Sequence, residues 1–211
     1  VLREEKFDRR ETTEGASQSK PEVASVSAIP IAKEIISKPV YRVIKRGLDL
    51  GFSALMLLIL APLFLVVYIL VVTTSKGPAL YMSRRVGRCG KTFLFPKFRT
   101  MYVDAEQRRA ELEKLNEKDG PIFKMKHDPR VTPVGRVLRK YSLDELPQLL
   151  CVVKGEMSLV GPRPPIPSEV SQYDEAAQRR LSVKPGITCY WQIMGRSDLS
   201  FEEMVALDNR Y

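Results

Sequence analysis

Residues 51–72, GFSALMLLILAPLFLVVYILVV, decide how the rest of the chain is arranged. This nearly unbroken apolar run is long enough to cross a lipid bilayer as a helix. Three structures fit such a run: a buried helix of a soluble domain, a straight transmembrane span, and a kinked or re-entrant helix. Globular domains of this size rarely contain an apolar run of this length, so the buried helix is disfavoured.

Two features of the run favour a re-entrant helix. Pro62 lies in its middle, where it removes one backbone hydrogen bond and bends the helix. Basic residues also flank the run on both sides, and the positive-inside tendency places both flanks in the cytoplasm. The flanking residues are Lys33, Lys38, Arg42, Lys45 and Arg46 before the run, and Lys76, Arg84, Arg85 and Arg88 after it. From these residues alone, the straight span and the re-entrant helix both remain open.

The composition favours anionic partners. The 211 residues include 34 Lys and Arg against 25 Asp and Glu, a formal charge of +9. This balance fits a membrane surface, phosphorylated substrates or nucleic acid. Nucleic acid is disfavoured because the basic residues are spread out and no recognised binding motif is present. Three widely spaced cysteines predict a reducing compartment, and the single histidine, His127, is interpreted as a loop residue.

The rest of the sequence predicts a mostly helical α+β fold. Residues 79–85 and 92–98 have the pattern of two short strands joined by a glycine-bracketed turn. Helices are expected over residues 104–118, 134–141, 145–153 and 168–180.

The octapeptide SLDELPQL, residues 142–149, has two interpretations. Ser142 and Glu145 fit a capping box at the start of a helix, and capping is the favoured interpretation of these eight residues alone. The wider chain reverses that preference. Arg139 and Arg163 flank the carboxylates of Asp144 and Glu145, and a carboxylate pair among cations suits a metal ion and a phosphate together.

Two rigid turns follow. In SLVGPRPP, residues 158–165, prolines and a glycine hold the chain stiff around Arg163, so little entropy is lost on ordering that cation. In KPGIT, residues 184–188, Lys184 lies beside a similar turn, which leads to Trp191 and Gln192. Trp191 fits either stacking on a nucleobase or packing in the core.

Common phosphate-binding and metal-binding motifs are absent from the sequence. It contains neither G-x-x-x-x-G-K-[ST] nor G-x-G-x-x-G, and neither H-E-x-x-H nor C-x-x-C. A metal ion would therefore be held by the oxygens of Asp144 or Glu145, a ligand type that suits Mg²⁺.

Five motifs in this order resemble those of the bacterial sugar transferase family, the polyprenyl-phosphate hexose-1-phosphate transferases, also called monotopic phosphoglycosyl transferases. The resemblance runs from about Tyr41 to the end of the chain. The motifs are KFRTM (97–101), DPRVT (128–132), RKYSLDELPQL (139–149), KGEMSLVGPRP (154–164) and KPGIT (184–188).

The resemblance implies an enzyme that moves a sugar 1-phosphate from a UDP-sugar to undecaprenyl phosphate, releases UMP and initiates exopolysaccharide or O-antigen synthesis. Asp144 would be the nucleophile that forms a covalent phosphosugar intermediate, and Glu145 would assist it with Mg²⁺. It also implies a re-entrant helix broken at Pro62, at the cytoplasmic face of the bacterial inner membrane. We assign the phosphates to Arg99, Arg139, Arg163, Lys184 and Arg196, and the nucleotide to Trp191 and Gln192.

We expect three parts in the chain: a disordered or linker segment (1–40), a re-entrant helix-break-helix (41–76) and a small catalytic domain at the membrane surface (77–211), truncated at its C-terminus. Two residues depart from the family pattern, Ala61 in place of a serine and Cys189 in place of a glycine. The alternative to an enzyme is a non-catalytic, membrane-anchored basic module that binds anionic lipid or a partner protein.

Overall fold

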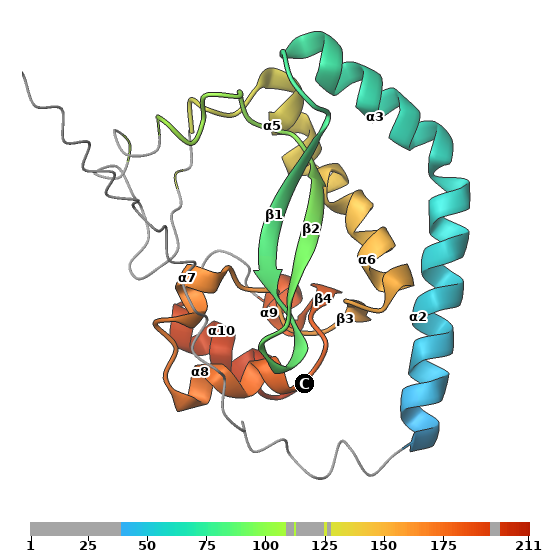
Figure 1. Cartoon of the computed structure of the whole chain (residues 1–211), viewed down its shortest axis with the longest axis vertical. Helices are drawn as coiled ribbons and strands as arrows, with labels where there is room; N and C mark the ends of the chain where they lie inside the picture. Colours follow the sequence, from blue (N-terminus) through green and yellow to red (C-terminus); the bar gives the residue numbers. More distant parts are fainter. Residues whose placement is uncertain (1–38, 109–111, 113–124, 126–127, 195–198) are drawn as a thin grey trace, which may run out of the picture.

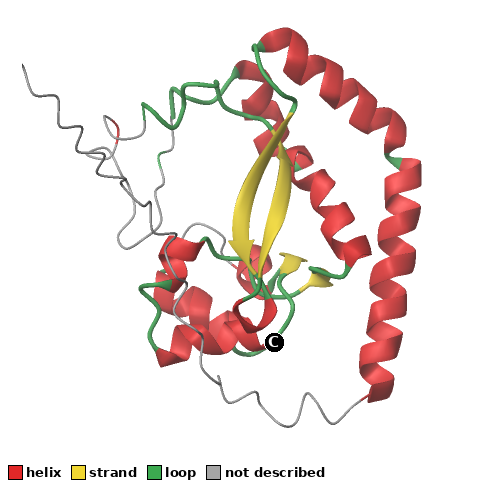
Figure 2. Ribbon diagram, viewed as in Figure 1, coloured by secondary structure: helices red, strands yellow, loops and turns green. Residues whose placement is uncertain are grey.

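The computed structural model describes residues 39–108, 112, 125, 128–194 and 199–211. In this part the fold is α+β and mostly helical, as the sequence predicts. A bent pair of helices runs along one side, a twisted hairpin lies in the middle, and short helices surround the turn of the hairpin (Figures 1 and 2). The predicted linker lies outside the described residues except for Pro39 and Val40, which begin the first helix, and most of the predicted helix 104–118 also lies outside them.

The apolar run folds as two helices, α2 (Pro39–Ile59) and α3 (Ala61–Thr74), with a bend of 61° at Leu60. Pro62 lies in the first turn of α3, where its missing N–H breaks no hydrogen bond and its fixed φ suits a helix start. The predicted break at Pro62 is confirmed. No single helix in the described ranges is long and apolar enough to cross a membrane, but the bent pair meets that test by length and composition.

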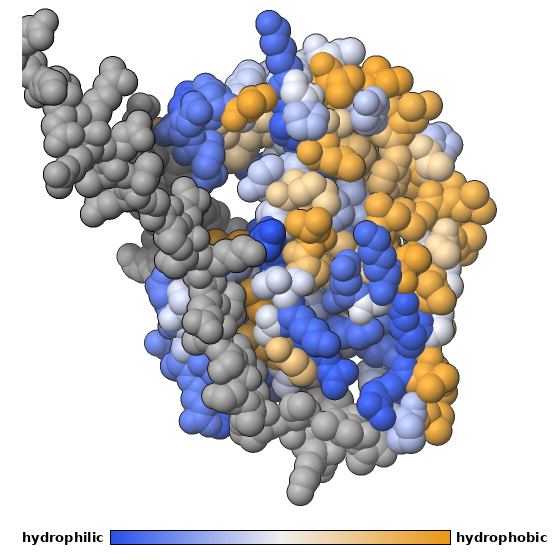
Figure 3. Space-filling view, viewed as in Figure 1, coloured by the Kyte–Doolittle hydropathy of each residue, from blue (hydrophilic) through white to orange (hydrophobic). Residues whose placement is uncertain are grey.

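Both helices expose apolar side chains. Figure 3 shows hydrophobic residues gathered over α3 and the adjoining part of α2. Apolar surface this extensive marks a contact with a membrane or another protein. The large exposed side chains include Val43, Leu48, Leu55, Leu58, Ile59, Leu65, Val66 and Ile69.

A buried carboxylate attaches α2 to the domain. Asp49 is 7% exposed, and it accepts hydrogen bonds from Ser158 Oγ at 2.8 Å and from the Leu159 amide at 3.1 Å. Lys45, one turn earlier, lies 3.4 Å from the same carboxylate. A buried charge destabilises a fold unless it is paired and hydrogen-bonded, so these partners define how α2 lies against the chain around residue 158.

Arg46 makes a second attachment. Its guanidinium donates to the carbonyls of Val152 at 2.6 Å and Val153 at 2.8 Å. These carbonyls lie in the last turn of α6 (Leu149–Lys154), where carbonyls have no intrahelical partner. Residues that the sequence shows as a basic flank therefore also join α2 to the domain.

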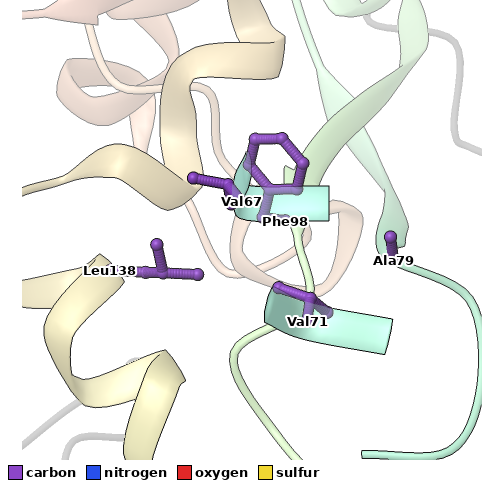
Figure 4. Close-up of a cluster of buried hydrophobic side chains, with 5 residues drawn as sticks. All are labelled: Val67, Val71, Ala79, Phe98 and Leu138. Carbon is purple, nitrogen blue, oxygen red and sulfur yellow. The ribbon is translucent and has the colours of Figure 1, made fainter. Parts of the chain in front are cut away.

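The two predicted strands are present as β1 (Leu80–Val86) and β2 (Thr92–Phe98), an antiparallel pair whose turn contains the short helix η1 (Arg88–Gly90). Buried side chains from α3, the residue before β1, β2 and α5 (Pro133–Lys140) join the helix pair to the hairpin (Figure 4). Fully burying a Val or Leu side chain contributes about 1.5–3 kcal/mol, so this cluster holds α3 against the domain. Its members are Val67, Val71, Ala79, Phe98 and Leu138.

The C-terminal third consists of short elements around a two-stranded parallel sheet. These are β3 (Ser158–Val160), α7 (Pro167–Val170), α8 (Glu175–Arg179), η4 (Arg180–Ser182), β4 (Gly186–Thr188), α9 (Tyr190–Met194) and α10 (Phe201–Asp208). The single helix expected over residues 168–180 is wrong. Asp174 has extended backbone and caps α8 by accepting from the Ala177 amide at 2.8 Å, which separates α8 from α7.

Gly135 is one of the described positions at which the backbone leaves no room for a side chain. A Cβ atom there would lie 2.0 Å from the backbone oxygen of Thr100, which cannot move without displacing the end of the hairpin. We expect Gly135→Ala to lower the free energy of unfolding by about 3 kcal/mol, the upper range for overpacking. Thermal or denaturant unfolding of the detergent-solubilised protein measures it.

Gly51→Ala is the matched control. Gly51 also lies in a helix, but a Cβ atom there would meet nothing within 4 Å. Replacing it is expected to leave stability unchanged or raise it by up to about 1 kcal/mol. Equal losses for the two variants would contradict the packing argument.

Candidate active site

The two adjacent carboxylates lie in a 3₁₀ helix, η3 (Leu143–Gln148), between α5 and α6. The capping box is wrong. Ser142 has a left-handed backbone (φ 56°), and among the described residues its side chain caps no N–H group. Pro147 cannot donate to a helical ladder, so the α-helix starts after it rather than at residue 145. The carboxylates are consequently free for other contacts.

Asp144 and Glu145 line a cleft of about 1240 Å³. The cleft lies between the hairpin, η3 and α9, and it extends to the part of α2 next to the break. Part of its lining is charged, polar or aromatic, and the part that α2 and the break contribute is apolar. The charged and polar lining residues used below are Arg85, Lys97, Arg139, Asp144, Glu145, Arg163, Trp191 and Gln192, and the apolar ones from α2 and the break are Phe52, Met56 and Leu60.

Asp144 is the more buried carboxylate, with 7% of its surface exposed. Burial raises its pKa, because water solvates the ionised form better than the protein does. Lys97 and Arg139 oppose this and lower the pKa, while the charge of Glu145 raises it further. The protonation of Asp144 therefore depends on the charges that surround it in the cleft.

Lys97 is the cation closest to the carboxylates, and sequence reasoning missed it. Its Nζ lies 2.5 Å from Glu145 Oε1 and 5.5 Å from the ring of Phe95. Strand alternation places Lys97 on the same face of β2 as the buried Phe93 and Phe95, and that pattern was available in the sequence.

Arg99, expected at a phosphate, lines the cleft that contains Asp144 and Glu145, but its guanidinium contacts the protein chain. Its guanidinium is buried and its five N–H groups donate to Ser75 Oγ and to the carbonyls of residues 75–78, at 2.5–3.1 Å. These bonds close the connection between α3 and β1. Each N–H group of Arg99 thus has a protein acceptor, so these bonds stabilise the fold, and its contact with a phosphate stays a prediction. Lys97 in the same KFRTM motif donates to Glu145.

Arg163 lies where the sequence predicts, in the cleft with the carboxylates. Glu169, which is 4% exposed, lies 3.8 Å from its guanidinium. Arg180 donates to the carbonyl of Arg163 at 3.4 Å and forms a buried ion pair with Asp208. Two ion pairs that the sequence did not indicate therefore stabilise the proline turn. Glu169 contacts the side chain of Arg163, and Arg180, paired with Asp208, donates to its carbonyl.

Arg85, which the sequence indicates only as part of the basic flank, is another cation that lines the cleft. It donates to the carbonyl of Pro164 at 3.2 Å, and its guanidinium lies 5.2 Å from the ring of Phe95. Burial and the nearby charge of Arg163 lower its pKa to about 10. It remains protonated at neutral pH, and the repulsion from Arg163 favours an anion between the two guanidinium groups.

Trp191 and Gln192 line both the cleft and a smaller chamber of about 200 Å³ beside it. Gln192 Oε1 accepts from the Cys189 amide at 3.2 Å, which orients its side chain. Trp191 Nε1 and Gln148 Nε2 are buried and have no hydrogen-bond partner among the described residues. The prediction of a nucleotide contact therefore stays a prediction, and the position of Trp191 in the cavity wall is compatible with it.

The remaining predicted phosphate ligands differ in position. Arg139 lines the cleft, with Nε donating to Thr100 Oγ1 at 2.9 Å. Lys184 lies outside both cavities formed by the described residues, beside Arg46 and Gly155. Arg196 lies outside the described residues.

A metal ion would have two protein carboxylates at this site. Within the described ranges, no group of three or more His, Cys, Asp or Glu side chains is placed to hold a metal. Mg²⁺ commonly binds one or two carboxylates and completes its shell with water and substrate phosphate, so Asp144 and Glu145 fit it.

Comparison with known proteins identifies relatives over most of the chain. The family described as bacterial sugar transferase matches residues 40–211. The galactosyl transferase CpsE of Streptococcus agalactiae is 48% identical over 79% of this chain, and the exopolysaccharide production protein ExoY of Sinorhizobium fredii is 46% identical over 82%. The undecaprenyl-phosphate galactose phosphotransferase of Salmonella typhimurium is 43% identical over 83%.

These relatives differ in length. The aligned region is 37% of CpsE and 38% of the Salmonella protein, but 79% of ExoY. The chain thus matches a minor part of two relatives and most of the third.

The cleft geometry predicts that Lys97 controls the ionisation of Asp144. Lys97→Met removes a charge that lowers the pKa of Asp144, so that pKa is expected to rise further above the ordinary aspartate value. Carboxyl-resolved NMR titration, or carbodiimide labelling of Asp144 as a function of pH, measures it. Lys140→Met removes an exposed charge of α5 outside the cleft and should leave the titration unchanged. An unchanged or lower pKa in Lys97→Met would refute this coupling.

Proposed function

The chain belongs to the bacterial sugar transferase family, and from that premise we propose that it transfers a sugar 1-phosphate from a UDP-sugar to undecaprenyl phosphate and releases UMP. The observation that carries the proposal is the buried carboxylate of Asp144, with Glu145 beside it and Arg85, Lys97 and Arg163 in the same cleft. The names of relatives refer to undecaprenyl-phosphate galactose transfer and to exopolysaccharide production. We place this chain at the same kind of step, the start of lipid-linked glycan synthesis.

The reaction we propose has two displacements at one phosphorus atom. A carboxylate oxygen of Asp144 bonds to the phosphorus that carries the sugar, the bond to the bridging oxygen breaks, and UMP leaves. A phosphate oxygen of undecaprenyl phosphate then bonds to the same phosphorus, and Asp144 is released as a carboxylate. The product is undecaprenyl diphosphate sugar. Covalent catalysis of this kind replaces one difficult step by two easier ones.

The charges around Asp144 suit this chemistry. An anionic nucleophile and an anionic diphosphate repel each other, so cations must offset the charge at the phosphorus. Arg85 and Arg163 would hold the diphosphate, and Lys97 would keep Asp144 ionised while moving between Glu145 and the substrate. Mg²⁺ held by Asp144 and Glu145 would further neutralise the phosphate oxygens.

The bent helix pair supports placement at a membrane. Its exposed apolar side chains lie on both sides of the break, and α2 near the break also lines the cleft. We propose that α2 and α3 enter and leave the bilayer by its cytoplasmic face. The apolar part of the cleft, lined by Phe52, Met56 and Leu60, would then receive the first isoprene units of the acceptor while its phosphate reaches Asp144.

Asp144→Asn tests the nucleophile. The purified protein is mixed with Mg²⁺ and a panel of UDP-sugars without lipid, and its intact mass is measured. We expect a sugar-phosphate adduct on Asp144 with UMP released, and we expect Asp144→Asn to lose the adduct and to reduce turnover by about a thousandfold or more, as removal of a catalytic nucleophile does.

Asp104→Asn is the matched control for that experiment, because Asp104 is an exposed carboxylate outside the cleft. It should form the adduct at the wild-type rate. If no adduct forms but lipid-linked product still appears, the displacement is direct and Asp144 serves the metal. If wild type yields neither, the alternative of a non-catalytic module that binds anionic surfaces in a salt-dependent way is favoured.

Removal of divalent cations tests the metal. EDTA is expected to abolish transfer, and added Mg²⁺ to restore it, because the diphosphate charge is otherwise incompletely neutralised. Calorimetry without donor gives a second readout: Glu145→Gln should bind Mg²⁺ more weakly than wild type, whereas Glu202→Gln, an exposed change on α10, should not. Transfer that continues undiminished in EDTA would exclude the metal.

A further inference from the structure

Three cations gather where α2 meets the end of α6, and none of them lines the catalytic cleft. A Cβ atom on Gly155 would lie 3.4 Å from Arg46 Nη2 and 3.6 Å from Lys184 Nζ, so the two charged groups lie within a few ångströms of one point. Arg88, at the hairpin turn, is near enough to act electrostatically on Lys184. Arg46, Arg88 and Lys184 are named the Lys184 cluster here, and none of them lines the cavities at Asp144.

The Lys184 cluster lacks an acidic partner of its own. Lys184 Nζ forms no hydrogen bond or ion pair with a described residue, and Arg88 Nε is buried without a hydrogen-bond partner in the same part of the chain. The one carboxylate that acts on Lys184 is Asp49, which already binds Ser158, Leu159 and Lys45. Burial and the neighbouring cations accordingly lower the pKa of Lys184.

The surface next to the cluster is apolar. Val43 and Leu50 lie within one helical turn of Arg46 on α2, and they are 72% and 40% exposed. Figure 3 shows hydrophilic residues beside the lower part of α2, bordering hydrophobic ones. A ligand that fits both surfaces has an anionic head and an apolar body.

We propose that the Lys184 cluster binds the phosphate of an anionic membrane phospholipid whose acyl chains lie along the exposed apolar side chains of α2. This inference rests on the proposed membrane placement of α2 and α3. Unpaired like charges repel one another, and a lipid phosphodiester supplies the missing negative charge at the level of the headgroups. Because the cluster lies outside the cleft, this phosphate is not one that reacts.

The consequence for the enzyme is a second attachment to the bilayer. Lys184 directly precedes the turn that leads through β4 to Trp191 and Gln192, and Arg46 is bonded to α6. A lipid bound between them would therefore hold the nucleotide side of the cleft at a constant height above the membrane surface.

Native mass spectrometry of the full, detergent-solubilised chain tests the site. The protein is titrated with phosphatidylglycerol and with phosphatidylcholine of identical acyl chains, which share the phosphate and differ in net charge. We expect wild type to bind the first molecule of phosphatidylglycerol about tenfold more tightly than the first molecule of phosphatidylcholine. Lys184→Gln should weaken it about fivefold, since one basic residue contributes about 1 kcal/mol at an anionic surface. Arg88→Gln should weaken it in the same direction.

Arg179→Gln is the matched control. Arg179 is an exposed cation paired with Glu175 on α8, which lies across the fold from α2 (Figure 1). It should bind phosphatidylglycerol within about twofold of wild type. Thermal unfolding of each variant checks that it is folded.

Three results would overturn the proposal: equal binding of the two lipids by wild type, equal losses in Lys184→Gln and Arg179→Gln, or displacement of phosphatidylglycerol by inorganic phosphate at constant ionic strength. The last would identify a site for a soluble anion. Transfer assayed in detergent with the same preparations separates this test from that of the proposed function, because Arg88→Gln, a change at a cluster member outside the cleft, should retain turnover there. If wild type shows no transfer, the proposed function is refuted. The lipid titration still decides whether the Lys184 cluster binds an anionic lipid.

Discussion

The arrangement of the molecule depends on the buried carboxylate of Asp49. A carboxylate buried in a helix is tolerated only where it meets suitable hydrogen-bond donors, and Ser158 and Leu159 provide them. This requirement determines the position of α2 along the domain, and Arg46 reinforces it at the end of α6. The same contacts attach α2 to β3, the strand that leads directly into the turn of Arg163. The bent helix pair and the turn of Arg163 therefore share one attachment.

Opposing electrostatic effects determine the state of the cleft. Burial favours the protonated form of Asp144, whereas Lys97 and Arg139 favour the ionised form that a nucleophile requires. In the reaction that we propose, an arriving diphosphate and metal ion would shift the balance between these opposing effects. Phe95 supports this arrangement, because the cations of Arg85 and Lys97 both lie against its ring.

Cations of this protein fall into groups with different physical roles. The cations that line the cleft, such as Arg85, Lys97 and Arg163, lie with the carboxylates around an open cavity, where they are able to bind an anionic ligand reversibly. Arg99 and Arg46 instead donate to backbone carbonyls. Arg99 satisfies carbonyls of the connection between α3 and β1, and Arg46 satisfies carbonyls in the last turn of α6. Lys184 belongs to neither group. Its ammonium has no hydrogen-bond or ion-pair partner in the part of the chain that the structure describes, and it lies beside Arg46, whose neighbours Val43 and Leu50 on α2 are exposed. This is the physical basis of the proposed lipid site.

The sequence by itself determined the break at Pro62, the two strands of the hairpin and the family to which the dyad of Asp144 and Glu145 belongs. These depend on local chemistry: a proline without an N–H, alternating side chains, and motifs in a fixed order. Only the tertiary structure decided which cations face the dyad. Lys97 and Glu145 are 48 residues apart. Strand alternation places Lys97 and Arg99 on the same side of the chain, so the local pattern does not tell which of the two pairs with Glu145. Contacts between distant residues decide this, because a guanidinium or ammonium group takes its role from the acceptors that the fold brings to it.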